Sequence, residues 1–282
     1  MNILSNDQLH RVAPSIFACE PAGGLSEKYR FVPTIDVLDA LRSEGFHPVA
    51  VATSRSKTDD GRDYVKHTLR LRREADLGIT LKRGGAVGQC VPELALTNSH
   101  NGTSGFILDA ALHRLVCSNG LVCADSQGSL RYRHTGKDDL VGRVIEGAYE
   151  IVEDFPLIAD QVEAWSAIQL DAHQRQALAQ AALPLRFDAD ETTGAYPVTA
   201  DQLLVPRRYG DRNPDLFSTF NVLQENLIRG GIYTGRKNGR RQSTRKVTSV
   251  DRDLKLNRAL WTLADALAKH VSGTDSLLKE AA

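Results

Sequence analysis

The sequence predicts an α+β fold, with a mostly antiparallel sheet and packed helices followed by a helical C-terminal half. Apolar and polar residues alternate with a period of two in several segments between residues 46 and 135, as they do in half-buried strands. From residue 140 onward, the apolar residues recur at helical spacing instead. The chain has 282 residues, of which 41% are hydrophobic, and this is enough to bury a core without disulfides or metals.

The N-terminal part is expected to contribute an arm, a short strand and one helix. Residues 1–28 are predicted to form an extended, partly ordered arm, because Pro14 and Pro21 interrupt any long element. A short strand is expected at residues 29–32. Thr34 is a candidate N-cap for a helix over residues 35–44, which Gly45 would end. The predicted sheet core spans residues 29–139.

Residues 46–53 and 64–72 are predicted to pair as a β-hairpin. In the second segment, alternate residues would form an apolar face and a basic face. The apolar face would carry Val65, His67, Leu69 and Leu71, and the basic face Tyr64, Lys66, Thr68, Arg70 and Arg72. Further short strands are expected at residues 77–81, 91–97 and 130–134.

A polar, glycine-rich loop is predicted at residues 98–104, directly after the strand expected at residues 91–97. Its Asn98, Asn101 and Gly102 have the hydrogen-bonding and positive-φ chemistry of turns, so the loop is expected to organise the fold more than to perform chemistry. Truncating His100 is expected to leave stability nearly intact. Residues 106–116 fit either a strand or a helix, and we favour a strand to Leu108 and then a short helix capped by Asp109.

Residues 140–282 form the predicted helical half. Helices are expected over residues 140–151, after Pro156, and over residues 171–183, 199–205 and 216–229. A last long helix would begin near Ser249 or Asp251 and continue to about residue 270. The segment at 229–246 between the last two helices is predicted to be a basic loop.

Several motifs resemble the phage/plasmid-like proteins of the YubP, YfjQ and YafZ type, a family carried by phages and plasmids. The motifs are NSHNGTS at 98–104, RLVCSNGLV at 114–122, STFNVLQENL at 218–227, RRQSTR at 240–245 and KLNRALW at 255–261. The similarity runs over roughly residues 30–265. It implies a mobile-element setting but transfers no defined activity. The order of helix, hairpin, further strands and helix is also similar to the core of phage single-strand-annealing recombinases.

The net charge is zero, but the charges are unevenly distributed. Residues 146–201 carry eleven acidic and two basic side chains, whereas residues 229–258 carry ten basic and two acidic ones. Asymmetry on this scale favours a polyanionic partner or contacts between copies of the chain. Head-to-tail contacts would produce a homo-oligomer, which light scattering at low and high salt would detect.

The basic loop at 229–246 is the strongest candidate binding site. Its glycines let the backbone approach phosphates, its arginines bind phosphate through two hydrogen bonds, and Tyr233 can stack on a base. The predicted nucleic-acid-binding residues here are Arg229, Tyr233, Arg236, Lys237, Arg240, Arg241, Arg245 and Lys246. The competing interpretation is an ordinary solvated loop.

Two smaller basic groups lie in the predicted sheet. The first consists of Lys66, Arg70, Arg72 and Arg73, and the second of Arg131, Arg133 and Lys137. A sheet that presents basic and aromatic side chains is a common platform for single strands. An ordinary solvent-exposed face of a half-buried sheet explains the first group equally well.

Histidines and cysteines gather in one part of the sequence, but without the local pairs of a zinc site. They are His67, His100, His113, His134, Cys117 and Cys123. Simple burial explains them better, so neither a metal nor a cofactor is expected. The chain also lacks a G-x-S-x-G motif and a phosphate-binding loop with its Lys–Ser/Thr pair. No catalytic residue is therefore assigned.

The sequence thus predicts a non-enzymatic DNA-binding protein of a mobile genetic element, which binds and anneals single strands as an oligomer. With no signal peptide and no apolar run of membrane length, it is expected to be cytoplasmic with reduced thiols. Two alternatives stay open. One is an anti-restriction or anti-defence protein that binds a host protein through its acidic half, and the other is a metal-dependent nuclease.

Overall fold

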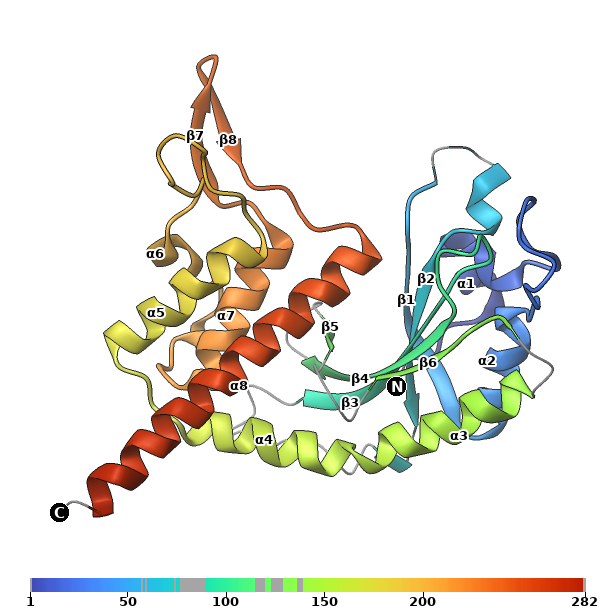
Figure 1. Ribbon diagram of the computed structural model, residues 1–282, viewed down its shortest axis with the longest axis horizontal. Coiled ribbons are helices and arrows are strands. Elements are labelled where there is room, and N and C mark those ends of the chain that lie inside the picture. The colour runs from blue at the N-terminus through green and yellow to red at the C-terminus, as the bar shows by residue number, and fades with distance from the viewer. Residues whose placement is uncertain are drawn as a thin grey trace. The chain divides into compact units, whose positions relative to one another are not determined.

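The computed structural model describes residues 2–56, 58, 60–73, 75–76, 90–114, 120–122, 129–135 and 139–280. The fold is α+β, as the sequence predicts, because an antiparallel sheet forms first and helices follow it (Figure 1). The chain divides into two compact units. The first contains Met1–Thr80, Cys90–Leu157 and Thr248–Asp251, and the second Leu81–Gln89, Ile158–Val247 and Arg252–Ala282. The predicted boundaries at residues 28 and 139 stay predictions.

One sheet organises the first unit. Its strands are β1 Phe46–Thr53, β2 His67–Arg73, β3 Cys90–Asn98, β4 Phe106–Arg114, β5 Gly120–Val122 and β6 Ser129–Tyr132. Within the described residues they follow the order β1-β2-β3-β4-β5, and β6 also pairs with β4. Every one of these pairs is antiparallel. The predicted hairpin is thus confirmed as β1–β2, and the predicted strands at 91–97 and 130–134 as β3 and β6.

The two faces of this sheet differ in chemistry. Leu69 lies opposite Leu96, and Leu96 opposite Leu108, so these fully buried leucines share one face. The helices α1 (Asn6–Val12), α2 (Thr34–Ser43) and α3 (Leu140–Glu153) pack against the sheet (Figure 1). The alternate residues, including Arg70 and Glu93, form a second, polar face.

Strand β4 replaces the short helix that the sequence predicts from Asp109. Its residues pair with β3 on one side and with β5 and β6 on the other. These pairings supply backbone hydrogen bonds along β4. The apolar pattern fits a strand and a helix equally, and pairing with the neighbouring strands decides between them. Asp109 consequently lies within a central strand and is fully buried.

Two predictions for the N-terminal part are also wrong. Residues 6–12 are not extended but helical, because Ser5 and Gln8 form a capping box and Leu9 is buried. Residues 29–32 form no strand, although the Arg30 backbone N–H donates to the His134 carbonyl at 2.8 Å. The strand predicted at residues 77–81 lies outside the described residues.

The helical half contains α4 Phe155–Ala167, α5 Ala172–Ala182, α6 Ala200–Leu203, α7 Leu216–Arg229 and α8 Val250–Glu280. Asp171 caps α5, Thr199 caps α6 and Asp215 caps α7. The N-cap predicted at Thr34 is wrong, because α2 begins at Thr34 itself and its N-cap is Pro33, which has no polar side chain to bond the helix N-terminus. Within the described residues, no helix is both long and apolar enough to span a membrane.

Helix α7 is the centre of the second unit. Every residue from Leu216 to Ile228 is buried, as expected for a helix surrounded by other elements. Phe220 contacts Trp165 of α4 and Trp261 of α8, with ring centroids 5.8 and 5.9 Å away. Aromatic packing therefore joins three helices of this unit.

Gly147 of α3 allows a close approach to β6 in the first unit. A Cβ atom there would lie 2.1 Å from the Tyr132 hydroxyl and 2.8 Å from Leu130 Cδ1. We therefore expect Gly147→Ala to lower the free energy of unfolding by about 1 kcal/mol or more, measured by urea denaturation. Gly273→Ala is the matched control, because nothing lies within 4 Å of its Cβ. That change should raise stability slightly through helix propensity, and equal effects at the two sites would contradict the close approach.

Candidate functional site

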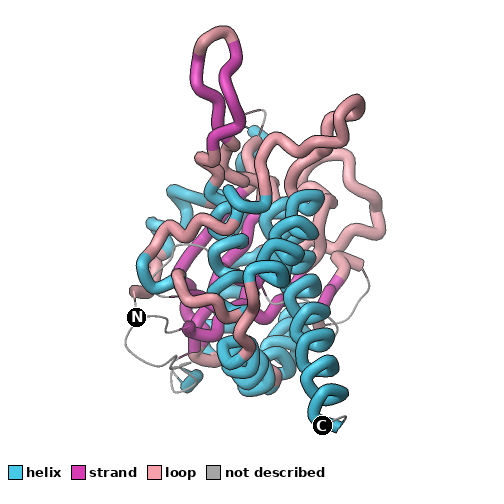
Figure 2. The backbone as a smooth tube through the Cα atoms, turned by 90° about the vertical axis from the view of Figure 1, so that its left-hand side faces the viewer, coloured by secondary structure: helices cyan, strands magenta, loops and turns pink. Residues whose placement is uncertain are grey.

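The predicted basic loop is a β-hairpin. Strands β7 (Tyr233–Lys237) and β8 (Arg240–Ser243) pair so that Lys237 lies opposite Arg240. The two residues between them, Asn238 and Gly239, have φ values of 51° and 74°. Positive φ at both central residues is what a tight two-residue hairpin turn requires. Figures 1 and 2 show this hairpin protruding from the helices of the second unit.

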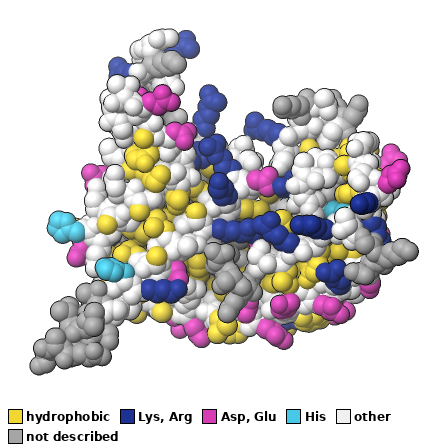
Figure 3. Space-filling model, viewed as in Figure 1, with side chains coloured by type: hydrophobic (Ala, Val, Ile, Leu, Met, Phe, Trp, Pro, Cys, Tyr) yellow, Lys and Arg dark blue, Asp and Glu magenta, His cyan; other side chains and the backbone are white. Residues whose placement is uncertain are grey.

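The hairpin presents cations to solvent. Arg236, Arg240, Arg241, Arg245 and Lys246 are exposed, and among the described residues none of them forms an ion pair. Figure 3 shows lysine or arginine side chains on both sides of the hairpin tip, among uncharged atoms. Tyr233 is 41% exposed, and the Arg241 guanidinium lies 5.1 Å from the centre of its ring. An aromatic ring and cations thus share one small surface.

The base of the hairpin is anchored to the preceding loop. Arg207 donates to the Gly230 carbonyl and, at 2.6 Å, to Asn226 Oδ1. Gln202 donates to the Tyr233 carbonyl at 3.0 Å. Gly230 has φ 67°, and a Cβ there would lie 2.6 Å from the Arg245 backbone, so only glycine fits this crossing.

This loop carries a second arginine–tyrosine pair that the sequence reasoning missed. Tyr209 is 83% exposed, and the Arg212 guanidinium lies 5.0 Å from its ring centre. In the sequence, residues 207–214 are a basic stretch in which no local pattern distinguishes Tyr209.

Arg229, also predicted to bind nucleic acid, is paired instead with a buried carboxylate. Glu225 binds Arg229 at 2.9 Å and Arg208 at 3.0 Å. Burial alone would raise the pKa of Glu225, but hydrogen bonding and charge from Arg208, with the charge of Arg229, lower it overall. We therefore leave Arg229 out of the binding surface.

The basic group on β2 is likewise paired within the fold. Glu93 is fully buried and accepts from Arg70 at 2.5 Å and from Arg72 at 2.6 Å. Arg73 binds Asp76 at 2.8 Å, and Lys66 binds Asp251 at 2.6 Å. The polar face of the sheet is therefore a set of ion pairs and not an open basic platform.

The third basic group is small. Arg131 and Arg133 are exposed on and just after β6. The position of Lys137 and the side chain of Lys237 lie outside the described residues. Among the predicted nucleic-acid-binding residues, those of the β7–β8 hairpin therefore form the main group of exposed cations.

The polar loop at residues 98–104 is held by its own hydrogen bonds, in keeping with the structural role expected from the sequence. Ser99 Oγ accepts from the Ser104 backbone N–H at 2.8 Å, and Asn101 Oδ1 accepts from the Thr103 hydroxyl at 2.6 Å. Gly102 has φ 75°. Asn98 and His100, which belong to this loop, are fully buried.

Behind the loop lies a buried hydrogen-bonded histidine network. The Thr34 hydroxyl lies 3.0 Å from both His67 Nε2 and His100 Nε2, and 2.9 Å from Asn98 Nδ2. His67 Nδ1 lies 2.8 Å from the Ser15 hydroxyl. On the far side, Asn98 Oδ1 lies 2.8 Å from His134 Nε2, so one chain of contacts joins α2, β2, β3 and the end of β6.

The proton arrangement of this network is constrained. His134 Nδ1 faces the Arg30 carbonyl at 3.1 Å while its Nε2 faces Asn98 Oδ1, and both oxygens only accept. A neutral imidazole of His134 satisfies both contacts only if the side-chain amide of Asn98 is flipped, so that its Nδ2 and not its Oδ1 faces His134 Nε2. The Thr34 hydroxyl then donates to Asn98, and His67 and His100 donate to Thr34. The alternative is a protonated His134.

Burial favours the neutral state. It lowers the pKa of His67 to about 3, with a further contribution from nearby His100, and lowers the pKa of His100 to about 4. It also lowers the pKa of His134, against the raising effect of the Arg30 carbonyl. His100 Nδ1 is buried without a hydrogen-bond partner, which makes its protonation costly.

Metal binding gains no support from the described residues. They contain no group of three His, Cys, Asp or Glu side chains able to hold an ion. Cys117 and Cys123, and the side chain of His113, lie outside the described residues. The nuclease alternative thus has no site to which we can assign it.

The architecture defines a protein with an α+β sheet unit and a helical unit that carries an exposed basic hairpin. The chain belongs to the family described as "Domain of unknown function (DUF932)", which matches residues 21–261. It is 43% identical over 264 residues to "UPF0380 protein YafZ" of Escherichia coli K12, covering 94% of this chain and 91% of that one. Its identity to "UPF0380 protein YfjQ" of the same strain is 42% over 264 residues, with the same coverage. The family resemblance predicted from the motifs is confirmed, and no solved structure matches the chain significantly.

We expect the buried histidines to make the fold sensitive to acid. Their folded-state pKa values are depressed, so between pH of about 6.5 and 4 the unfolded chain binds more protons. The neutral histidines therefore contribute fully to the free energy of unfolding above about pH 6.5. As the pH decreases below that value, the free energy of unfolding falls by about 1.4 kcal/mol per pH unit for each such histidine. Urea denaturation at pH 7.5 and 5.0 measures this slope.

Variants separate the network from other acid effects. His67→Gln should flatten the slope by about one proton, whereas His173→Gln, at an exposed histidine, should leave it unchanged. The burial of His100 also reverses the expectation from the sequence that its truncation is harmless. A slope that is identical in all three proteins would remove the histidines as its cause.

Proposed function

We propose that this protein is a non-enzymatic, single-stranded DNA-binding protein that uses the β7–β8 hairpin as its main contact. The observation that carries the proposal is the exposed set of arginines around Tyr233, unpaired within the described residues. Ion pairs within the fold involve the predicted cations of β2 and Arg229, whereas Arg131 and Arg133 form only a small exposed group. The hairpin cations stay available for phosphates, whose neutralisation releases counterions and drives binding.

Single strands fit this surface better than duplexes. Tyr233 and Tyr209 each present an exposed ring with an arginine beside it, at 5.1 and 5.0 Å. An unpaired base can stack on such a ring while the arginine binds the adjacent phosphate. A base inside a duplex is already stacked on both sides and cannot do so.

Annealing and self-association are part of the same proposal. The loop after α5 carries exposed acidic residues, including Asp188 and Glu191, in the same unit as the basic hairpin. Opposite patches on one chain favour head-to-tail contact between copies. Several hairpins would then follow one strand, as a protein that protects and pairs mobile-element DNA requires.

Removing the hairpin cations should weaken DNA binding and its dependence on salt. We expect the combined substitution Arg236→Gln, Arg240→Gln and Arg241→Gln to reduce the slope of log affinity against log salt. For a single strand the reduction should be about 0.7 for each lost phosphate contact. A fluorescence titration with an oligothymidine at several salt concentrations measures it.

A charge-matched variant controls for net charge. Arg11→Gln, Lys28→Gln and Lys269→Gln remove the same number of exposed cations away from the hairpin. This protein should retain most of the affinity and slope. Equal losses in both triple variants, or no DNA binding by the unaltered protein, would contradict the proposed interface.

Removing the exposed rings should affect single strands selectively. We expect Tyr233→Ala and Tyr209→Ala each to weaken single-strand binding by about fivefold or more, because base stacking on an aromatic ring contributes about 1–3 kcal/mol. Tyr→Phe variants keep the ring and should bind nearly as well. Duplex binding, measured in parallel, should change little, and an equal loss for duplex would exclude stacking.

A further inference from the structure

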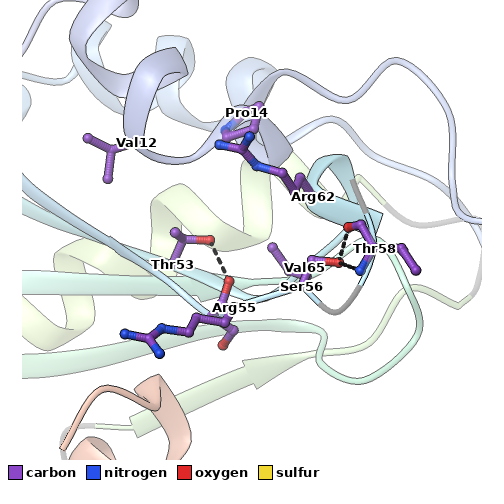
Figure 4. Close-up of a pocket in the computed structure, with 9 residues that line it drawn as sticks. Val12, Pro14, Thr53, Arg55, Ser56, Thr58, Arg62 and Val65 are labelled. Atoms are coloured by element: carbon purple, nitrogen blue, oxygen red, sulfur yellow. Dashed lines mark hydrogen bonds between the residues drawn. The ribbon is translucent and has the colours of Figure 1, made fainter. Parts of the chain in front are cut away.

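The first unit contains a cavity that the proposed DNA interface does not use. Its volume is about 570 Å³, within the usual range for small-molecule sites. Val12 and Pro14 supply an apolar part of the lining. The rest comes mainly from the link between β1 and β2, which contributes Arg55, Arg62 and several hydroxyl side chains (Figure 4).

The charged side chains among the described lining residues are two arginines. Arg55 and Arg62 are both exposed, and neither has an ion-pair partner among the described residues. In Figure 4 the Arg62 side chain extends toward Pro14, and Thr53 lies between the two arginines in this view. No carboxylate of the described residues lines the cavity. This differs from Arg70 and Arg72, whose charges Glu93 compensates.

Hydroxyl groups of the described lining residues are held by local hydrogen bonds. Ser56 Oγ donates to the Thr58 carbonyl at 2.6 Å and accepts from the Thr58 backbone N–H at 3.2 Å. A Cβ on Gly61 would lie 2.5 Å from Ser56 Oγ, so Gly61 packs closely against Ser56. Side chains that are already held in place lose less entropy when a ligand binds.

The apolar wall is equally well supported. Ser15 follows Pro14 and lies 2.8 Å from His67 Nδ1, and the Val65 carbonyl lies 3.3 Å from the same nitrogen. Pro14 and Val65 both line the cavity. Because neutral His67 donates through Nε2 to Thr34, its Nδ1 accepts from the Ser15 hydroxyl, and the buried histidine network therefore supports the lining segment that contains Pro14.

We propose that this cavity binds a phosphate monoester on a nucleotide-sized ligand. A phosphate monoester carries a charge of about −1.5 to −2, which two guanidinium groups match in charge and in hydrogen-bonding geometry. The apolar wall then packs against the attached sugar or base. This chemistry is shared by a free nucleotide and by the 5′-phosphorylated end of a DNA strand.

Calorimetric titration with dTMP tests the site directly, with thymidine as the ligand without phosphate. The unaltered protein should bind dTMP saturably and thymidine at least tenfold more weakly. Arg55→Ala and Arg62→Ala should each weaken dTMP binding about tenfold, and Lys substitutions less, since they keep the charge but lose the planar fork. Lys28→Ala, which removes an exposed cation elsewhere in this unit, should have no effect.

A second comparison distinguishes the two sources of the phosphate, a free nucleotide and the 5′-phosphorylated end of a strand. In a protein that also carries the three hairpin substitutions, a 5′-phosphorylated oligothymidine should bind more tightly than its 5′-hydroxyl form if strand ends are the ligand. Equal binding of the two, with dTMP binding retained, assigns the site to free nucleotides. No saturable dTMP binding, or arginine variants that bind dTMP normally, would overturn the site. Neither outcome depends on whether the hairpin binds DNA.

Discussion

The hydroxyl group of Thr34 is the contact on which the first unit depends most. It joins three buried polar side chains from different segments: His67 of β2, Asn98 at the end of β3, and His100 of the following loop. Asn98 extends the chain of contacts to His134, after β6. The segments at 29–33 and 99–105 have no strand pairing of their own. Their positions are fixed by this network, and a buried network of this kind tolerates little change because each unsatisfied group is costly.

Burial also dictates the charge state of the network. The rings of His67 and His100 lie 5.9 Å apart, and those of His100 and His134 lie 6.2 Å apart. Several positive charges at this spacing in a buried site would repel one another and lack hydration. The network is stable when all three imidazole rings are neutral. The neighbouring hydroxyl and amide groups then determine which nitrogen of each ring carries the proton. The same feature supports the wall of the nearby cavity through Ser15.

Buried carboxylates decide which arginines remain available. Glu93 binds two arginines of the sheet, and Glu225 binds Arg208 and Arg229 of the second unit. Removing either glutamate would leave uncompensated charges in the fold, so these pairs are structural. Cations that form no ion pair among the described residues include those of the β7–β8 hairpin, the small group of Arg131 and Arg133, and the two arginines of the cavity lining. We propose a phosphate ligand for the first and the last of these sets.

The sequence by itself determined the fold class, most helices and the hairpin β1–β2, because hydrophobic periodicity and capping residues are local signals. It also located the basic segment that became β7–β8. It could not resolve residues 106–114, whose apolar pattern suits a strand and a helix, and only pairing with β3, β5 and β6 decided for a strand. Nor could it separate paired from exposed arginines, or join His67, His100 and His134. Those outcomes depend on contacts between residues far apart in the chain, which spacing along the sequence does not encode.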